Sequence, residues 1–237
     1  MSLTRFFNAF IQFCLPATCI FCLHQTGSDQ NICPSCRQSL PILTHSCVQC
    51  ARHLEGEPRH LICGVCLKNP PPFDKTFALF SYAPPIISLV LNLKFHRQLS
   101  HAKLLGALLT EQMQNKWYAG HPLPDVIIPI PLHRKRLRER GFNQALEIAR
   151  PIARALKIPI DYKQTKRIRH TAPQTELDAK ERQKNVQNAF AVTQDYKDAH
   201  LLVIDDVITT GSTITSFCEL LKKQGAKQID VIAAARR

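Results

Sequence analysis

The stretch of the chain that decides its fold is Leu201-Leu202-Val203-Ile204-Asp205-Asp206-Val207-Ile208-Thr209-Thr210-Gly211-Ser212-Thr213. Its four leading apolar residues predict a buried strand, and two adjacent aspartates follow at the carboxyl end of that strand. The part rich in threonine then turns into a helix, expected over residues 212–224. In an open parallel sheet, ligands bind beyond the carboxyl ends of the strands, and the first N–H groups of a helix attract phosphate. The stretch therefore predicts a phosphate-binding loop at the end of a central strand.

The side chains of this stretch predict a division of roles between carboxylates and hydroxyl groups. Gly211 lets the backbone approach a ligand closely, and the neighbouring hydroxyl groups add hydrogen-bond donors. Asp205 and Asp206 would repel a phosphate, so we expect them to bind the vicinal hydroxyl groups of a ribose and a magnesium shell. The alternative is an ordinary strand, turn and helix with two solvated aspartates, which the combination of features disfavours.

Strands and helices alternate through the rest of residues 73–237. Apolar runs predict strands over residues 76–82, 125–130, 158–162, 201–205 and 228–234. Apolar spacings of three and four predict helices over residues 85–95, 101–117, 143–157 and 212–224. The polar, basic segment 163–184 is expected as a long loop with at most one helical turn. This alternation predicts an α/β fold with a parallel sheet covered on both faces.

The positive charge of the chain is concentrated in a few places. Lysine and arginine total 31 against 18 aspartates and glutamates, for a net charge of +13. Residues 73–237 carry +11 of this charge, and twelve of their 26 basic residues lie in two segments expected as loops, 134–140 and 163–184. A solvated face would spread such charge along helices, so the concentration favours an anion-binding site.

Nine of the ten cysteines lie between Cys14 and Cys66. Residues 6–15 are only weakly apolar and are not followed by a small-residue cleavage site, so we expect no secretory signal. We also expect no membrane span, because the sequence lacks a run of about 18 apolar residues. The expected location is therefore the cytoplasm, where clustered cysteines more often bind metal than form disulfides.

Eight of these cysteines form four C-x-x-C pairs, which are Cys19/Cys22, Cys33/Cys36, Cys47/Cys50 and Cys63/Cys66. Ten residues separate the first two pairs, twelve separate the last two, and the pattern repeats after 28 residues. Each pair offers two thiolates to a tetrahedral zinc ion, so the eight predict two closed, structural zinc sites. Adjacent pairs are the preferred grouping, and an interleaved grouping stays open. Eight free thiols or disulfides are the alternative, and Cys14 and Cys218 are expected to be buried apolar residues.

A proline-rich stretch, Asn69-Pro70-Pro71-Pro72, predicts a stiff linker. We therefore expect a small double zinc-ribbon domain over residues 1–72 and a larger domain over residues 73–237. About 70 residues with so little apolar core need metal ions to fold.

Residues 203–213, VIDDVITTGST, resemble the phosphoribosyl pyrophosphate (PRPP) signature of the type I phosphoribosyltransferases. Most of the chain resembles the ComF/GntX-like proteins, which join a double zinc ribbon to such a domain. Four further segments carry that narrower resemblance, namely the paired cysteines up to Cys66, Leu93-Lys94-Phe95, Arg136–Gln144 and Arg167–Phe190. His96-Arg97 departs from the pattern, because a glycine is expected soon after Lys94.

The resemblance implies a type I phosphoribosyltransferase fold and a role for each matching residue. Asp205 and Asp206 would bind the ribose hydroxyl groups, and the 5′-phosphate would lie against Thr209, Thr210, Gly211, Ser212 and Thr213. The segment from Pro131 to Gly141 would be the pyrophosphate loop, with Arg134, Lys135 and Arg136 as PRPP-binding cations beside Arg138 and Arg140. The segment 163–184 would be the flexible loop that closes over the reaction. Its candidate catalytic residues are Arg167, Arg169 and Gln174, together with the two aspartates.

Such an enzyme displaces pyrophosphate from the anomeric carbon of PRPP with a nucleophile, usually a nitrogen, and uses cations and magnesium to neutralise the leaving group. The sequence contains no segment that we can assign to purine or pyrimidine recognition. Three hypotheses therefore stay open. The chain is a transferase with an unknown acceptor, a PRPP-responsive protein that handles single-stranded DNA with competence or DNA-processing partners, or a regulatory scaffold without chemistry. The second follows from the link of the resembling family to natural transformation.

Overall fold

The computed structural model describes residues 17–26, 31–56, 61–169 and 188–237. The chain divides into two compact units, residues 1–41 and residues 42–237. The expectations for Cys14, Gln174 and most of the segment 163–184 fall outside the described residues. Within those residues, every helix is too short or too polar to cross a membrane.

The unit of residues 1–41 contains the first two cysteine pairs. Thr18 and Gln25 form an isolated antiparallel bridge on either side of the first pair. The second pair lies at the start of the short helix α2 (Pro34–Gln38), where the Cys33 sulfur accepts a hydrogen bond from the Cys36 amide at 3.5 Å. Each pair therefore occupies a tight turn that directs two sulfurs the same way.

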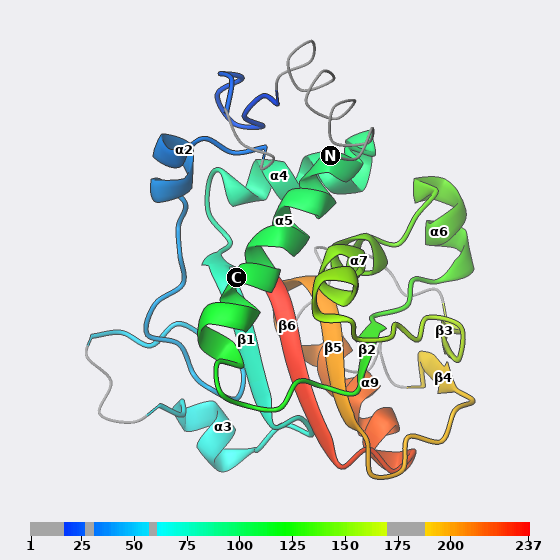
Figure 1. The fold of residues 1–237 in the computed structure, drawn as a ribbon. Coiled ribbons are helices and arrows are strands. Elements are labelled where there is room, and N and C mark those ends of the chain that lie inside the picture. Colours follow the sequence, from blue (N-terminus) through cyan, green and yellow to red (C-terminus); the bar gives the residue numbers. More distant parts are fainter. Residues whose placement is uncertain (1–16, 27–30, 57–60, 170–187) are drawn as a thin grey trace, which may run out of the picture. The chain divides into compact units, whose positions relative to one another are not determined.

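The unit of residues 42–237 is built on a four-stranded parallel sheet (Figure 1). Its strands are β1 (Lys75–Ser81), β2 (Val126–Pro129), β5 (His200–Ile208) and β6 (Gln228–Arg236), in the order β1-β6-β5-β2. Val203 in β5 pairs with Ile128 in β2 and with Val231 in β6. The predicted parallel sheet is confirmed, and β5 is longer than predicted, because it continues through both aspartates to Ile208.

Helices cover both faces of this sheet, as predicted. Figure 1 shows α4 (Ile86–His96), α5 (Leu99–Gln112) and α7 (Gln144–Leu156) in front and α9 (Ser212–Lys223) behind. Alternate residues of β5 face opposite ways: Leu201 and Val203 pack in one core with Phe217 of α9. Leu202 and Ile204, also fully buried, point to the other face, where α7 packs against β5. The predicted helix 101–117 consists of α5 followed by a π-helical turn, η1 (Met113–Trp117).

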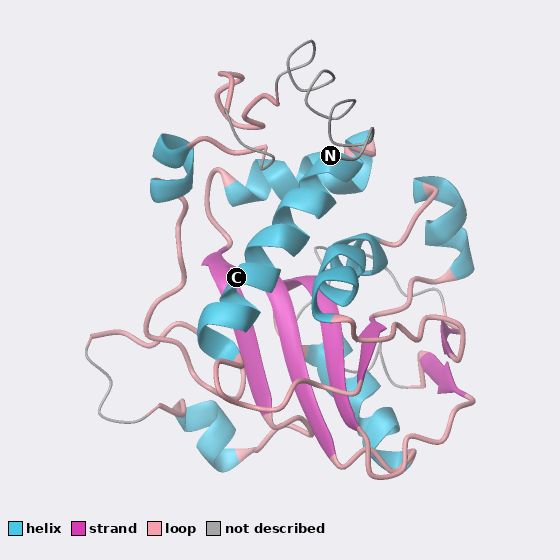
Figure 2. Cartoon of the chain, viewed as in Figure 1, coloured by secondary structure: helices cyan, strands magenta, loops and turns pink. Residues whose placement is uncertain are grey.

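Two segments differ from the sequence prediction (Figure 2). Residues 134–140, expected as a loop, form helix α6 (Arg134–Arg140). The His133 ring accepts a hydrogen bond from the Lys135 amide at its start, and Gly141 ends it with a φ of 84°. The beginning of the expected loop 163–184 forms β3 (Thr165–Arg167), which pairs antiparallel with β4 (Phe190–Val192). Of the expected strand 158–162, the structure retains one isolated bridge, from Ile160 to Ile127.

The third and fourth cysteine pairs belong to the same unit as the sheet. They lie in residues 47–66, with the last pair at helix α3 (Gly64–Lys68). Thr76 of the edge strand β1 donates its amide to the Val48 carbonyl at 2.9 Å and its hydroxyl to the Gln49 carbonyl at 2.6 Å. Contacts thus group residues 42–72 with the sheet, while the domain boundary after residue 72 stays a prediction from composition.

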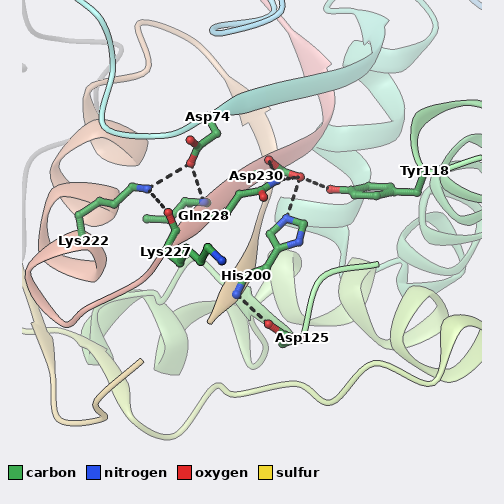
Figure 3. Close-up of polar contacts among 9 residues, drawn as sticks. Asp74, Tyr118, Asp125, His200, Lys222, Lys227, Gln228 and Asp230 are labelled. Carbon is green, nitrogen blue, oxygen red and sulfur yellow. Dashed lines mark hydrogen bonds and ion pairs between the residues drawn. The ribbon is translucent and has the colours of Figure 1, made fainter. Parts of the chain in front are cut away.

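A buried polar cluster lies at the amino ends of β5 and β6 (Figure 3). Asp230 accepts hydrogen bonds from the Tyr118 hydroxyl at 2.7 Å and from the Gln228 side chain, and its Oδ2 lies 2.9 Å from Nε2 of His200. The cluster ties the end of η1 to the starts of two strands. The cluster lies at the opposite end of the strands from Asp205 and Asp206, so it stabilises the sheet without contacting these two aspartates.

Candidate functional site

A cavity of about 630 Å³ lies at the carboxyl end of the sheet. It is bounded by the ends of α4 and β2, by α6, by β3 and by the end of β5. The candidate residues that line it are Lys94, Arg136, Arg140, Gln144, Arg167, Asp205, Asp206, Thr209 and Thr213. This is the edge at which an open parallel sheet binds ligands, so the position agrees with that predicted from the sequence.

The expected phosphate loop, residues 209–213, leads from β5 into α9. Gly211 has a φ of 85°, and a Cβ built there would meet no atom within 4 Å, so the turn needs glycine for its backbone angle rather than for space. Thr209 and Thr213 line the cavity. Thr210 and Gly211 instead line a separate cavity of about 240 Å³, and the hydroxyl of Thr210 lies 2.9 Å from that of Ser212. The predicted loop residues therefore do not all face one cavity: Thr209 and Thr213 line the larger one, and Thr210 and Gly211 line the smaller one.

The two adjacent aspartates both line the cavity. The Asp206 amide donates to Oδ1 of Asp205 at 2.8 Å, and Lys94 from α4 forms an ion pair with the Asp206 carboxylate. Burial raises the pKa of Asp205 to about 8, with the charge of Asp206 adding to the rise and Lys94 opposing it. At neutral pH the pair therefore carries less than two negative charges. The segment Leu93-Lys94-Phe95 contributes to the family resemblance, but the sequence alone assigns no role to Lys94.

The basic residues of α6 separate according to the face of the helix. Arg136 and Arg140, four residues apart on one face, line the cavity. Arg134, Lys135 and Arg138 are exposed and lie outside that lining. The Arg140 guanidinium lies 5.8 Å from the ring centroid of Phe95, and burial lowers its pKa. Of the predicted cations Arg134, Lys135 and Arg136, the structure brings only Arg136 to the aspartates.

Arg167, the last residue of β3, is buried at the cavity wall. Its guanidinium lies 5.4 Å from the ring centroid of Phe190. Burial lowers its pKa to about 10, Arg136 lowers it further and Asp205 opposes the shift. Arg169, two residues on, is exposed and outside the cavity lining. Arg167 therefore lies in β3, within the first residues of the expected closing loop.

Gln144 is a residue of the site that the sequence gave no role. It is the first residue of α7, and its side chain is 2% exposed. Its amide nitrogen has no hydrogen-bond partner within the described residues, although it lines the cavity. The preceding Asn143 caps α7 and donates to the Ile130 carbonyl at 2.9 Å, which fixes the helix start beside the end of β2. A buried amide without a partner is costly unless a ligand completes it.

The eight paired cysteines form two four-cysteine clusters. The first cluster is Cys19, Cys22, Cys33 and Cys36, and the second cluster is Cys47, Cys50, Cys63 and Cys66. Within each, the sulfurs lie within 4.8 Å of one another, and the structure therefore brings adjacent pairs together. The Cys22–Cys33 and Cys50–Cys63 sulfur separations are both 3.7 Å. A tetrahedral zinc–sulfur distance of about 2.3 Å requires about 3.8 Å, so both clusters fit zinc. Cys218, a residue of α9, is buried in the core, as expected.

Comparisons with known proteins agree with this architecture. A model of the double zinc ribbon domain matches residues 10–67, and a model of the phosphoribosyl transferase domain matches residues 143–237. The DNA utilization protein YhgH of Escherichia coli (strain K12) is 36% identical over 219 residues, covering 92% of this chain and 89% of that protein. Competence protein F of Haemophilus influenzae is 33% identical, covering 91% and 96%. The solved purine phosphoribosyltransferase from Pyrococcus horikoshii Ot3 is 20% identical with a TM-score of 0.33, covering 56% of this chain and 80% of that one.

Proposed function

The chain belongs to the ComF/GntX-like family, in which a double zinc ribbon accompanies a phosphoribosyltransferase domain, and from this we propose that it binds PRPP with magnesium in the cavity at the carboxyl end of its sheet. The observation that carries the proposal is the pair Asp205 and Asp206, which stands between the start of α9 and the cations of α6 and β3. Carboxylates suit ribose hydroxyl groups, and a helix start suits a phosphate.

Each region of the cavity supports one part of the ligand. The 5′-phosphate would lie against the phosphate loop, where Thr209 and Thr213 offer hydroxyl groups. Asp205 and Asp206 would accept hydrogen bonds from the ribose hydroxyl groups. Magnesium, when bound with PRPP, would neutralise charge on the pyrophosphate. Arg136, Arg140 and Arg167 would supply the remaining positive charge. Of these three, Arg167 is the candidate catalytic residue. The unpaired amide of Gln144 would donate to a phosphate oxygen.

The reaction that this arrangement supports is phosphoribosyl transfer. A nucleophile, usually a nitrogen, forms a bond to the anomeric carbon as the bond to the pyrophosphate oxygen breaks, and pyrophosphate leaves with the electron pair. Arginines fixed around the leaving group stabilise the negative charge that develops on it. Arg169 and Gln174 stay candidates for the loop that closes over the ligand.

A second candidate function is PRPP-responsive handling of single-stranded DNA without transfer. The names of two relatives, a DNA utilization protein and a competence protein, favour it. The concentration of positive charge on residues 73–237 also supports it. Under this proposal the protein acts in the cytoplasm with competence or DNA-processing partners, and its two zinc ions are structural.

Calorimetry with PRPP and magnesium tests the proposal. We expect wild-type protein to bind, and Asp205→Asn/Asp206→Asn to lose binding while its thermal unfolding stays cooperative. The exposed pair Asp195→Asn/Asp198→Asn is the matched control and should bind as wild type does. Undiminished affinity in the first double variant would reject the site. Pyrophosphate release in the presence of candidate acceptors then separates the transferase from the protein without chemistry.

A further inference from the structure

We propose that zinc in the second cluster holds the phosphate loop in its ligand-binding conformation, and that Arg236 is the positioning residue that joins the two. This proposal rests on the proposed function only where PRPP affinity is the readout.

Arg236 bonds simultaneously to three separate segments. Its side chain donates to the Cys50 carbonyl through Nε at 3.1 Å and to the Ile208 carbonyl through Nη1 at 3.1 Å. Nη1 also donates to the carbonyls of Thr209 and Arg237. Cys50 is a ligand of the second cluster, Ile208 ends β5 and Thr209 begins the phosphate loop. One side chain therefore connects a metal knuckle to the first residue of the loop.

The electrostatics explain why a guanidinium is buried at this place. Arg236 is 7% exposed, and the bonds described above all go to carbonyl oxygens, which do not neutralise its charge. Zinc with four thiolates carries a net charge of about −2. A metal-loaded second cluster therefore supplies the counter-charge that makes burial of Arg236 favourable.

The hydrogen bonds of Arg236 also fix how the loop presents its amides. In a trans peptide the carbonyl and the following N–H point in opposite directions. Holding the carbonyls of Ile208 and Thr209 at the guanidinium therefore turns the N–H groups of Thr209 and Thr210 away from it. Those are the first amides of the loop to which we assign the phosphate. Losing the Arg236 side chain would release the Thr209 carbonyl, whereas the Ile208 carbonyl would still accept a hydrogen bond from the Arg237 amide at 2.9 Å.

The contact lies beside a cavity of about 240 Å³, which is lined by Cys50 and Cys66 of the second cluster, by Thr210 and Gly211 of the loop and by Arg236. The hydrogen bonds of Arg236 therefore connect the cluster and the loop at a place where the packing between them is incomplete. The first cluster belongs to the other compact unit, residues 1–41, and so provides a matched control.

The experiment compares three full-length variants with wild type. Cys50→Ser/Cys66→Ser removes the second zinc, Cys22→Ser/Cys36→Ser removes the first, and Arg236→Gln removes the link while both metals stay. Zinc content, amide hydrogen exchange of residues 208–215 without PRPP, and PRPP affinity are measured for each.

We expect Arg236→Gln to contain two zinc ions, to exchange the loop amides at least about tenfold faster, and to bind PRPP at least about tenfold more weakly. Loss of the second zinc should give the same two effects, whereas loss of the first should give neither. Arg236→Lys should restore part of the protection. If Arg236→Gln and the variant lacking the second zinc both leave loop exchange unchanged, the coupling is wrong.

Failure of the proposed function is recognised separately. If wild-type protein does not bind PRPP, the ligand assignment fails, while the exchange measurement still decides whether the second cluster controls the loop. If Cys50→Ser/Cys66→Ser does not fold, Arg236→Gln alone decides, because it retains every metal ligand.

Discussion

Desolvation in the fold raises the pKa of Asp205 to about 8, and the charge of the neighbouring Asp206 adds to the rise. At pH 7 the Asp205 carboxyl is therefore mainly protonated when no ligand contacts it. A ribose hydroxyl or a magnesium shell needs the ionised carboxylate, so ligand binding has to release that proton. The sequence showed both aspartates but could not show this shift, because the burial and the neighbouring Lys94 are set by the fold.

We predict that PRPP affinity rises with pH up to about pH 8 and then levels off. Below that pH the affinity should change by up to about tenfold per pH unit, because one proton is released on binding. Calorimetry in two buffers of different ionisation enthalpy counts that proton directly. Asp205→Asn provides the control, since the dependence that remains in it belongs to PRPP itself. A wild-type profile identical to this control would contradict the prediction.

Residues that act through a partner distant in the sequence were hardest to assign. Lys94 lies on α4 and its carboxylate partner on β5, and Gln144 became visible as a candidate only through its buried, unpartnered amide. The aspartates and the phosphate loop were predictable because strand, turn and helix follow one another in a single stretch. A local motif thus predicts residues that follow one another in the chain, whereas side chains that meet only through packing become candidates once the fold is known.

Among the elements, α6 shows where reasoning from charge fails. Five of its seven residues are cations, and the sequence prediction placed that charge in a loop at an anion-binding site. Arginine, lysine, leucine and glutamate are nevertheless good helix formers, and His133 and Gly141 provide a start and an end. The hairpin of β3 and β4 was missed because its strands are three residues long and far apart in sequence. The long strands β5 and β6 were predicted, because their continuous runs of apolar residues indicate buried strands.

Helices α5 and α7 approach each other closely at Gly106. A Cβ there would lie 2.6 Å from the Ile148 carbonyl oxygen and 2.8 Å from Cγ of Pro151. We predict that Gly106→Ala lowers the free energy of unfolding by about 1–3 kcal/mol, even though alanine favours a helix more than glycine does. Gly64→Ala is the control, because a Cβ there meets nothing within 4 Å. Urea denaturation of both variants measures the difference, and equal stability of the two would refute the close approach.

At the scale of the whole molecule, the buried cluster around Asp230 joins η1, β5 and β6 (Figure 3). Burial on its own would raise the pKa of Asp230, but hydrogen bonds from His200, Tyr118 and Gln228 lower it overall. A lowered folded-state pKa contributes stability above the unfolded value of about 3.9, and this stability is lost as the pH falls through the folded value.

We therefore predict that Asp230→Asn destabilises the protein by about 1–3 kcal/mol at pH 7. The difference from wild type should shrink below about pH 4, where the wild-type carboxylate becomes protonated. Urea denaturation across this pH range measures both effects. Asp198→Asn, an exposed aspartate, should show neither. A difference that stays constant down to the lowest pH would mean that the charge of Asp230 does not matter.

The sequence gives the net charge of the molecule, but it does not show which cations of α6 line the cavity and which are exposed. Arg136 and Arg140 line the cavity, whereas Arg134, Lys135 and Arg138 are exposed. If the second candidate function holds, these exposed cations can contact single-stranded DNA while the other two hold pyrophosphate. If DNA instead contacted the cations of the cavity, DNA and PRPP would compete for them.

We predict weak, sequence-independent binding of single-stranded DNA that Arg134→Gln/Lys135→Gln/Arg138→Gln reduces without changing PRPP affinity. Each phosphate neutralised contributes about −0.7 to the slope of log affinity against log salt, so removing three contacts should make that slope shallower by about 2. The reciprocal control, Arg136→Gln/Arg140→Gln, should lose PRPP affinity and keep most DNA binding. Fluorescence anisotropy of a labelled oligonucleotide over a salt series measures both. Displacement of the oligonucleotide by PRPP with magnesium would instead show one shared site. If the oligonucleotide does not bind even at low salt, the exposed cations of α6 do not bind DNA, and the role of α6 is restricted to its two cations in the cavity.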